Sequence, residues 1–155
     1  RGLEKTFIPG RLQFVPEGTF PGEPAYLLDG AHNPHGMTSL VHYLGQGGVR
    51  PAAVVFSCLH DKNWHPVLEM LAHTLPGVPF FVPAMHNDRA EKAETIADLL
   101  RTSSQCPSES YSHLDEALAA AGRATGGKGP VLVTGSLYLL SDFFASHTKA
   151  LSRLS

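Results

Sequence analysis

The sequence is short of cysteine, of net charge and of long hydrophobic runs, and each shortage excludes a class of protein. Its two cysteines, Cys58 and Cys106, lie far apart and form no redox or zinc motif, so we expect a cytoplasmic protein without structural disulfides. The formal net charge of -2 provides no attraction to nucleic acid or to an anionic membrane surface. No apolar run approaches the ~20 residues that span a bilayer, and residues 1–7 lack the pattern of a signal peptide. We therefore expect neither nucleic acid nor a membrane among its partners.

The chain nevertheless has the composition of a folded domain. Hydrophobic residues make up 43% of its 155 residues, and a chain of this length buries roughly 70% of its unfolded surface. It contains no internal repeat and no low-complexity tract, so we predict a single domain over residues 1–155. Because the first residue is arginine and not methionine, we expect the chain to be a piece of a longer polypeptide.

Short apolar runs alternate with amphipathic patterns along the chain. The apolar runs predict strands at residues 11–15, 25–29, 52–57, 79–83 and 131–135. Hydrophobic residues at helical spacing predict helices over residues 37–44, 67–75, 93–100, 114–121 and 140–151. The segment "SSQCPSES" (103–110) and three segments rich in Gly or Pro are predicted loops. This order predicts an α/β fold, in which a mostly parallel open sheet carries helices on both faces.

Polar residues follow three of the predicted strands. They lie in "DGAHNPH" (29–35), "SCLHDKNWH" (57–65) and "TGSLY" (134–138), and a predicted helix follows each segment. The carboxyl ends of parallel strands face one edge of a sheet, where ligands bind in folds of this type. Helix N-termini add free N–H groups and a positive dipole end, which favour anions. The sequence therefore predicts one site for an anionic ligand, built from these three loops.

Each candidate residue in the first loop also has a purely structural explanation. Asn33 before Pro34 suits a helix N-cap. Asp29 could brace the turn through nearby N–H groups, or it could bind ribose hydroxyls or a metal. His32 and His35 could be solvated loop histidines or ligand contacts.

The other two loops leave the same choice open. Lys62 is an ordinary surface lysine by itself, but beside two polar strand ends it becomes a candidate anion contact. Ser136 is a candidate N-cap whose hydroxyl and neighbouring N–H groups also suit a carboxylate or a phosphate.

A phosphate-loop motif is present only in part. The stretch "GRATGGKG" (122–129) matches the phosphate-loop template G-x-x-x-x-G-K-[ST] except at its last position. Gly129 stands there in place of the Ser or Thr whose hydroxyl binds Mg²⁺. A strand also follows this stretch, where the motif needs a helix. We predict a flexible loop there.

A hydrolase-type metal site is a further possibility. Its ligands would come from the histidines and the aspartate of the first two loops, namely His32, His35, His60, Asp61 and His65. Their spacing matches no zinc pattern, and the partner cysteines of such a pattern are absent, so we predict no metal site.

Four motifs together resemble those of a known enzyme family. "DGAHNPHG" (29–36) is similar to the signature of folylpolyglutamate synthase and dihydrofolate synthase, which are members of the Mur ligase superfamily. "PGRLQ" (9–13), "DKN" (61–63) and "VLVTGSLYLL" (131–140) resemble further motifs of that family in the same order. The resemblance implies a Rossmann-like carboxy-terminal ligase domain.

The resemblance implies an ATP-dependent amide ligase. In such an enzyme ATP phosphorylates a pteroate or folate carboxylate, and the amine of L-glutamate then attacks the acyl phosphate. The implied cofactors are ATP and Mg²⁺, held mainly by an amino-terminal ATPase domain that this chain lacks. We therefore expect the chain to form one wall of an interdomain cleft and to be inactive alone.

The resemblance also implies roles for individual residues around the nucleotide. Arg11 and Asp29 match the positions expected to bind ATP, with Asp29 directed to the ribose or to a bridging water. His32 matches the motif histidine and is the expected catalytic residue, close to the triphosphate or the phosphoryl intermediate. His35 matches the motif without an assigned role. Because Asp29 and His32 belong to a predicted loop, we expect their replacement to affect turnover more than folding.

Three positions are expected around the incoming glutamate, namely Ser136, Lys62 and Asn33. The chain departs from the family pattern at Asn63, where an acidic residue is usual, and at residues 18–25, which lengthen the link before Asp29 as a hairpin insertion would. Two alternatives stay open beside the metal hydrolase. One is a Mur-type cell-wall amino-acid ligase domain, and the other is a non-catalytic nucleotide- or anion-binding module.

Overall fold

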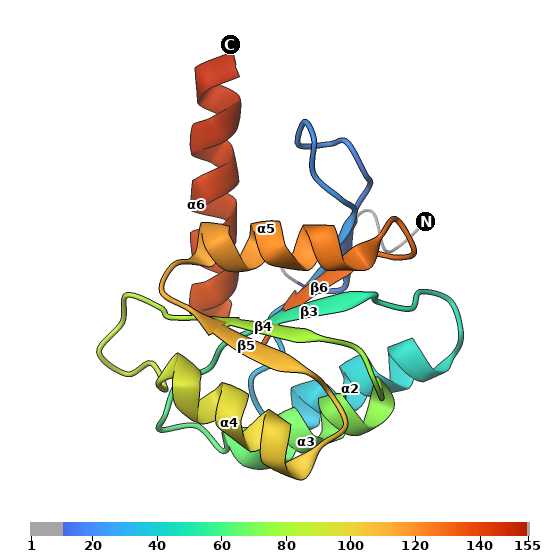
Figure 1. Cartoon of the computed structure of the whole chain (residues 1–155), viewed down its shortest axis with the longest axis vertical. Helices are drawn as coiled ribbons and strands as arrows, with labels where there is room; N and C mark the ends of the chain where they lie inside the picture. The colour runs from blue at the N-terminus through green and yellow to red at the C-terminus, as the bar shows by residue number, and fades with distance from the viewer. Residues whose placement is uncertain (1–10, 155) are drawn as a thin grey trace.

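A computed structural model describes residues 11–154 and contains one six-stranded sheet (Figure 1). Residues 9 and 10 of the "PGRLQ" motif lie outside the described part. The strands are β1 (Gln13–Val15), β2 (Tyr26–Asp29), β3 (Ala53–Phe56), β4 (Phe80–Pro83), β5 (Ser108–Tyr111) and β6 (Val131–Thr134). The helices are α2 (Pro34–Gly45), α3 (Trp64–Thr74), α4 (Ala93–Ser103), α5 (Leu114–Thr125) and α6 (Leu137–Leu154).

The strand order in the sheet is β1-β2-β6-β3-β4-β5. Only β1 pairs antiparallel to its neighbour, and all the other pairs are parallel. The predicted mostly parallel open sheet is therefore confirmed. The order also places β2 and β3 on either side of β6, which brings together the three strands that precede the polar loops.

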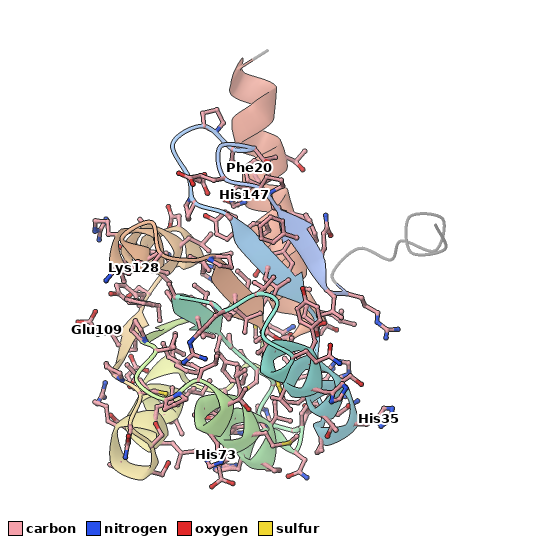
Figure 2. The ribbon with its side chains drawn as sticks, turned by 90° about the vertical axis from the view of Figure 1, so that its right-hand side faces the viewer. Phe20, His35, His73, Glu109, Lys128 and His147 are labelled. Atoms are coloured by element: carbon pink, nitrogen blue, oxygen red, sulfur yellow. The ribbon has the colours of Figure 1, made fainter. Side chains whose placement is uncertain are left out.

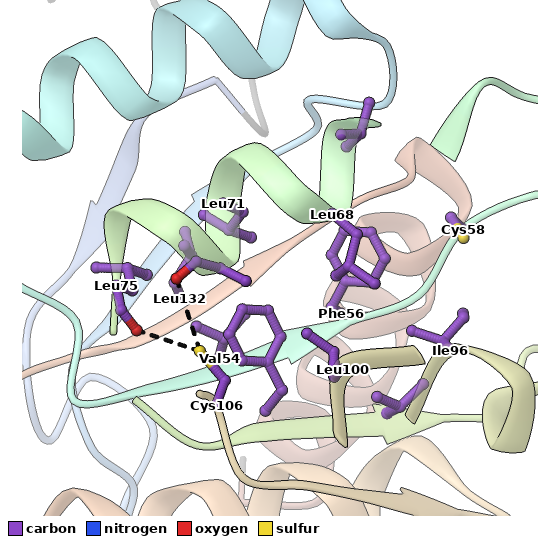
Figure 3. Close-up of a cluster of buried hydrophobic side chains, with 14 of the residues drawn as sticks. Val54, Phe56, Cys58, Leu68, Leu71, Leu75, Ile96, Leu100, Cys106 and Leu132 are labelled. Carbon is purple, nitrogen blue, oxygen red and sulfur yellow. Dashed lines mark hydrogen bonds between the residues drawn. The ribbon is translucent and has the colours of Figure 1, made fainter. Parts of the chain in front are cut away.

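Helices cover both faces of the sheet, as predicted. In Figure 1, α2, α3 and α4 lie below the sheet, and α5 and α6 lie on its other side. Two clusters of buried side chains follow this division, one under each group of helices. Figure 3 shows the first cluster, where the Cys106 thiol lies 3.3 Å from the carbonyl oxygen of Leu75. Strands buried on both faces need apolar side chains at every position, so their sequences are continuous apolar runs.

The prediction of a loop over residues 103–110 is wrong at its carboxyl end, because β5 begins at Ser108. This strand lies at an edge of the sheet and carries the polar sequence "SESY". The Ser108 hydroxyl donates to the carbonyl oxygen of Ala97 at 2.7 Å, which satisfies it inside the fold. A search for apolar runs misses such a strand, since an edge strand keeps polar side chains in water.

None of the helices within residues 11–154 combines the length and the apolar character needed to cross a bilayer.

The insertion at residues 18–25 forms the turn-rich connection of the β1–β2 hairpin, as expected. Glu23 of this connection and His147 of α6 meet at 2.8 Å between Oε1 and Nε2, and the Tyr26 hydroxyl donates to the same Oε1 at 2.5 Å. Burial raises the pKa of the Tyr26 phenol, so it stays protonated and remains a donor. The Phe20 and His147 rings pack with centroids 4.1 Å apart (Figure 2). The insertion is therefore attached to α6 by a partly buried polar cluster.

We expect His147→Ala to lower the free energy of unfolding by about 3 kcal/mol, because it leaves a cavity beside Phe20 and removes a partner from Glu23. Urea unfolding measures the change. The control is Thr148→Ala, which alters an exposed residue of the same helix. Equal stability of the two variants would show that the cluster does not support the fold.

Candidate functional site

The three polar loops leave adjacent strands at the same edge of the sheet. Asp29 at the end of β2 is in register with Thr134 of β6, and Phe56 of β3 is in register with Thr134 from the other side. All three strands run parallel, so their carboxyl ends open into one region. The convergence expected from the order of strands and helices is therefore present.

A cleft of about 190 Å³ lies between these loops. It is lined by His32 of the first loop, by residues of the other two and by one residue that follows β4: Leu59, Lys62, Arg89, Gly135, Ser136, Leu137 and Tyr138. Of the six predicted site residues, the structure thus brings together His32, Lys62 and Ser136. The lining does not include Arg11, Asp29 or Asn33.

Two larger hollows, of about 900 and 720 Å³, contain none of the predicted site residues. The first is lined mainly by the β1–β2 connection, α5 and the segment before β6, which lie toward the opposite ends of the strands. The second lies between α3 and α4. Their volume by itself does not indicate a site.

The His32 ring is oriented by the backbone of its own loop. Its Nδ1 lies 2.9 Å from the carbonyl oxygen of Gly30, which can only accept, so Nδ1 carries the proton. In the neutral ring this leaves Nε2 as an acceptor for a ligand. A side chain at Gly30 would bring its Cβ to 2.4 Å from Leu137, so this loop packs directly against the start of α6.

Asp29 is the last residue of β2 and is buried, with 8% of its surface exposed. Its Oδ1 accepts from the N–H of Ala31 at 2.8 Å, and its Oδ2 accepts from the N–H of Leu12 at 3.2 Å. Burial raises the pKa of the Asp29 carboxyl, while the two N–H groups and the charge of Arg11 act in the opposite direction. Both carboxylate oxygens of Asp29 therefore accept hydrogen bonds from backbone N–H groups. This agrees with the structural explanation, in which Asp29 stabilises the turn.

Arg11 is exposed beside this carboxylate. The next residue, Leu12, has φ of 46°, which is uncommon for a residue other than glycine. The bond from the Leu12 N–H to Asp29 helps to hold this conformation. Asp29 thus positions the segment that carries Arg11.

Asn33 caps α2, as its sequence context predicted. Its Oδ1 accepts from the N–H of Gly36 at 2.8 Å, and Pro34 occupies the first helical position. His35 is exposed in the first turn of the helix (Figure 2). The cap therefore supports the backbone where the first loop enters α2.

Ser136 directly precedes α6 and is almost fully buried, with 2% of its surface exposed. Its hydroxyl accepts from the N–H of Tyr138 at 3.0 Å, and its carbonyl oxygen accepts from the N–H of Leu140 at 3.3 Å. This is the geometry of an N-cap, and the hydroxyl proton stays available for a ligand. The capping and the ligand-binding explanations for Ser136 are therefore compatible.

Gly135 allows the third loop to approach the second. Its φ is 114°, and a Cβ on this residue would lie 2.2 Å from the backbone carbonyl oxygen of Ser57. Only glycine tolerates both the conformation and the approach. The hydroxyls of Ser57 and Thr134 beneath this contact are buried without a hydrogen-bond partner among the described residues.

Sequence reasoning missed Arg89, which lies in the segment after β4. Its Nε donates to Oδ2 of Asp61 at 2.7 Å, and its Nη2 donates to Oδ1 at 3.1 Å. This paired contact lowers the pKa of the Asp61 carboxyl and raises the pKa of the guanidinium. The polar run "HNDRAE" (86–91), which begins shortly after a predicted strand, was the signal that could have identified Arg89.

The histidines and Asp61, considered above as metal ligands, do not form a site. Within residues 11–154 no three His, Cys, Asp or Glu side chains lie close enough together to hold a metal ion. The prediction of a loop over residues 122–129 is wrong at its amino end, because α5 continues to Thr125 and only the residues after it form the loop before β6. Neither pattern adds a second candidate site.

Comparisons with known proteins agree with this geometry. Residues 10–137 match the family described as the Mur ligase, glutamate ligase domain. The dihydrofolate synthase/folylpolyglutamate synthase of Bacillus subtilis is 34% identical over 145 residues, which cover 91% of this chain and 31% of that protein. The chain thus spans about a third of the length of this relative.

Solved structures show the same architecture. The bifunctional folylpolyglutamate synthase/dihydrofolate synthase of Yersinia pestis superposes with a TM-score of 0.77 at 27% identity, over 94% of this chain and 32% of that one. The same enzyme has been solved with AMPPNP and a Mn ion. Escherichia coli FolC in complex with DHPP and ADP superposes with a TM-score of 0.78 at 24% identity, over 99% of this chain and 34% of that one. The chain belongs to the glutamate ligase domain family of the Mur ligases.

Proposed function

We propose that this chain is the carboxy-terminal part of a folylpolyglutamate or dihydrofolate synthase, which joins L-glutamate to a folate or pteroate carboxylate at the expense of ATP. The observation that carries the proposal is the single cleft into which His32, Lys62 and Ser136 converge. Relatives with these activities match nearly the whole chain, and one of them has been solved with a nucleotide analogue.

The chemistry of the cleft fits an amide ligation. The neutral amine of glutamate attacks the acyl carbon of an acyl phosphate and the C–N bond forms. Phosphate leaves with the electron pair of the C–O bond, and the amine nitrogen gives up one proton, which a base or the departing phosphate accepts. Negative charge develops on the acyl and phosphoryl oxygens during this step, and positioned donors stabilise it. Lys62, Ser136 and the N-terminus of α6 are such donors, and the His32 side chain lines the same cleft.

We assign the roles as follows. His32 is the catalytic residue at the phosphoryl group or at the attacking amine. Ser136 and Lys62 bind the glutamate, and Asn33 contributes to its binding by capping α2 beside His32. Arg11 binds the phosphates of ATP, and Asp29 contributes to ATP binding by holding the segment that carries Arg11.

ATP supplies the phosphoryl group, and Mg²⁺ neutralises its charge during transfer. We propose that an amino-terminal ATPase domain of the same polypeptide holds both and closes over the cleft. The protein would act in the cytoplasm, where both of its cysteines stay as free thiols.

An activity assay tests the proposal. The complete polypeptide that carries this chain is expected to release ADP only when ATP, L-glutamate and a dihydropteroate or folate acceptor are all present. The 155-residue chain alone is expected to release none. Product formed from a UDP-linked cell-wall precursor in place of the folate acceptor would assign the chain to the other branch of the superfamily. Product formed by the chain alone would contradict the proposal that a separate amino-terminal domain is required to hold ATP and Mg²⁺.

A further inference from the structure

Two titratable side chains that are far apart in the sequence meet near the amino end of β2, away from the candidate cleft. Glu23 belongs to the connection between β1 and β2, and His147 lies in the second half of α6. The His147 side chain is 5% exposed and the Glu23 side chain is 34% exposed. Figure 2 shows His147 beside Phe20, where the β1–β2 connection lies against α6. The proposed ligase chemistry uses none of these residues.

Both ring nitrogens of His147 face hydrogen-bond acceptors. Nδ1 lies 2.8 Å from the carbonyl oxygen of Phe143, which can only accept. Nε2 lies 2.8 Å from Oε1 of Glu23, and a carboxylate oxygen can also only accept. A neutral imidazole has a single N–H group, so it would place a lone pair opposite one of these two oxygens. Both hydrogen bonds therefore exist together only when the pair of Glu23 and His147 holds one additional proton.

The surroundings of the imidazole favour this proton on the ring. The ring centroid of His147 lies 4.1 Å from that of Phe20 and 4.1 Å from that of Phe143, with the planes tilted by 43° and 36°. The π-face of an aromatic ring attracts a cation at such a distance. The Tyr26 hydroxyl donates to the same Oε1 of Glu23 at 2.5 Å, which stabilises the charged form of the carboxylate. These contacts describe an imidazolium paired with a carboxylate.

No other charged side chain contacts this pair within residues 11–154. The charged side chains that line the adjoining hollow are Glu17 of the β1–β2 connection and two residues of α5, Asp115 and Arg123. None of these three forms a hydrogen bond or an ion pair with Glu23 or His147. The phenol of Tyr26 stays protonated, because burial raises its pKa. The proton balance of the contact therefore depends on Glu23 and His147.

We propose that Glu23 and His147 form a proton-dependent ion pair, which holds the β1–β2 connection on α6 and weakens when the imidazolium loses its proton. Among the described residues, their contact is the only hydrogen bond between the connection and α6. A free imidazole loses its second proton near pH 6.5, so above about pH 7 the unfolded chain lacks the proton that the ion pair needs. A folded state that holds a proton absent from the unfolded chain loses stability as the pH rises. The proposal does not depend on the ligase activity.

Urea unfolding of the chain at a series of pH values tests the proposal with Glu23→Gln. The amide of glutamine can donate to the free Nε2 of a neutral imidazole, so this variant keeps the contact without the additional proton. The unfolding equilibrium constant of the unsubstituted chain, divided by that of Glu23→Gln, should rise about tenfold between about pH 6 and about pH 8. Glu17→Gln alters an exposed carboxylate of the same connection, and the corresponding ratio for this control should stay constant. A constant ratio for Glu23→Gln would overturn the proposal.

Nitrogen NMR of the histidine side chains gives a second readout, made on the unsubstituted chain. At about pH 7.5, where a free imidazole is largely neutral, both ring nitrogens of His147 should carry protons. The signal is identified by its loss in His147→Gln. A His147 ring that is protonated at Nδ1 alone would show that no imidazolium forms, and the proposal would then be wrong.

Discussion

Gly135→Ala is expected to lower the free energy of unfolding by about 4 kcal/mol. A side chain at φ of 114° costs about 1–3 kcal/mol by itself, and overpacking adds a similar amount. The added Cβ would lie 2.2 Å from the carbonyl oxygen of Ser57, which belongs to the backbone and cannot rotate away. The loops that follow β3 and β6 would have to separate, and the wall of the cleft would be lost with them. Urea unfolding measures the stability change.

Gly77→Ala is the matched control for this substitution. Gly77 also has positive φ, at 80°, but a Cβ there would meet nothing within 4 Å. It should cost only about 1 kcal/mol, the penalty for the backbone conformation alone. Similar losses in the two variants would show that the contact with Ser57 is unimportant and that conformational strain explains the whole effect.

His32→Ala is expected to lower kcat of the complete ligase by at least about 100-fold and to change stability by no more than about 1 kcal/mol. The ring is only half buried, and its one described hydrogen bond is to the carbonyl oxygen of Gly30. The effect on activity rests on the proposed function. The measurements are steady-state kinetics and urea unfolding of the same preparations, with His35→Ala as an exposed control from the same motif.

Asp29→Ala should behave differently from His32→Ala. The expectation that both residues lie on a loop is wrong for Asp29, which ends β2 and is buried. Its removal leaves the N–H groups of Leu12 and Ala31 without their acceptor, so we expect a loss of about 2 kcal/mol in stability as well as a loss of activity. A Tm of Asp29→Ala equal to that of the unsubstituted chain would contradict the bracing role. Full activity of His32→Ala would remove the catalytic assignment.

The candidate site was predictable to the extent that it follows from the order of strands and helices. Parallel strands joined by helices must place their carboxyl ends together, so the convergence of the loops with His32, Lys62 and Ser136 could be inferred before any coordinates. The N-cap at Asn33 was predictable for a similar reason, because the cap depends on residues adjacent in sequence. Signals of this kind are local, or are consequences of topology alone.

Other features depend on which atoms meet across the fold. Both carboxylate oxygens of Asp29 accept from backbone N–H groups, one of them 17 residues away in the chain. The sequence alone left open whether Asp29 stabilises the turn or binds a ligand. Arg89 lines the cleft because the segments after β3 and β4 pair through Leu59 and Ala90, and no periodicity encodes that pairing. The edge strand β5 has no apolar run to reveal it.

The sequence by itself determined the α/β architecture and the edge of the sheet at which the three polar loops converge, and it predicted an anionic ligand there. These follow from hydrophobic periodicity and from polar residues at strand ends, which are properties of neighbouring residues. Only the tertiary structure decided which polar side chains face the cleft and which are occupied elsewhere. The physical reason is that hydrogen-bond partners and steric contacts between distant segments depend on distances of a few ångströms, which the pattern of residue types does not specify.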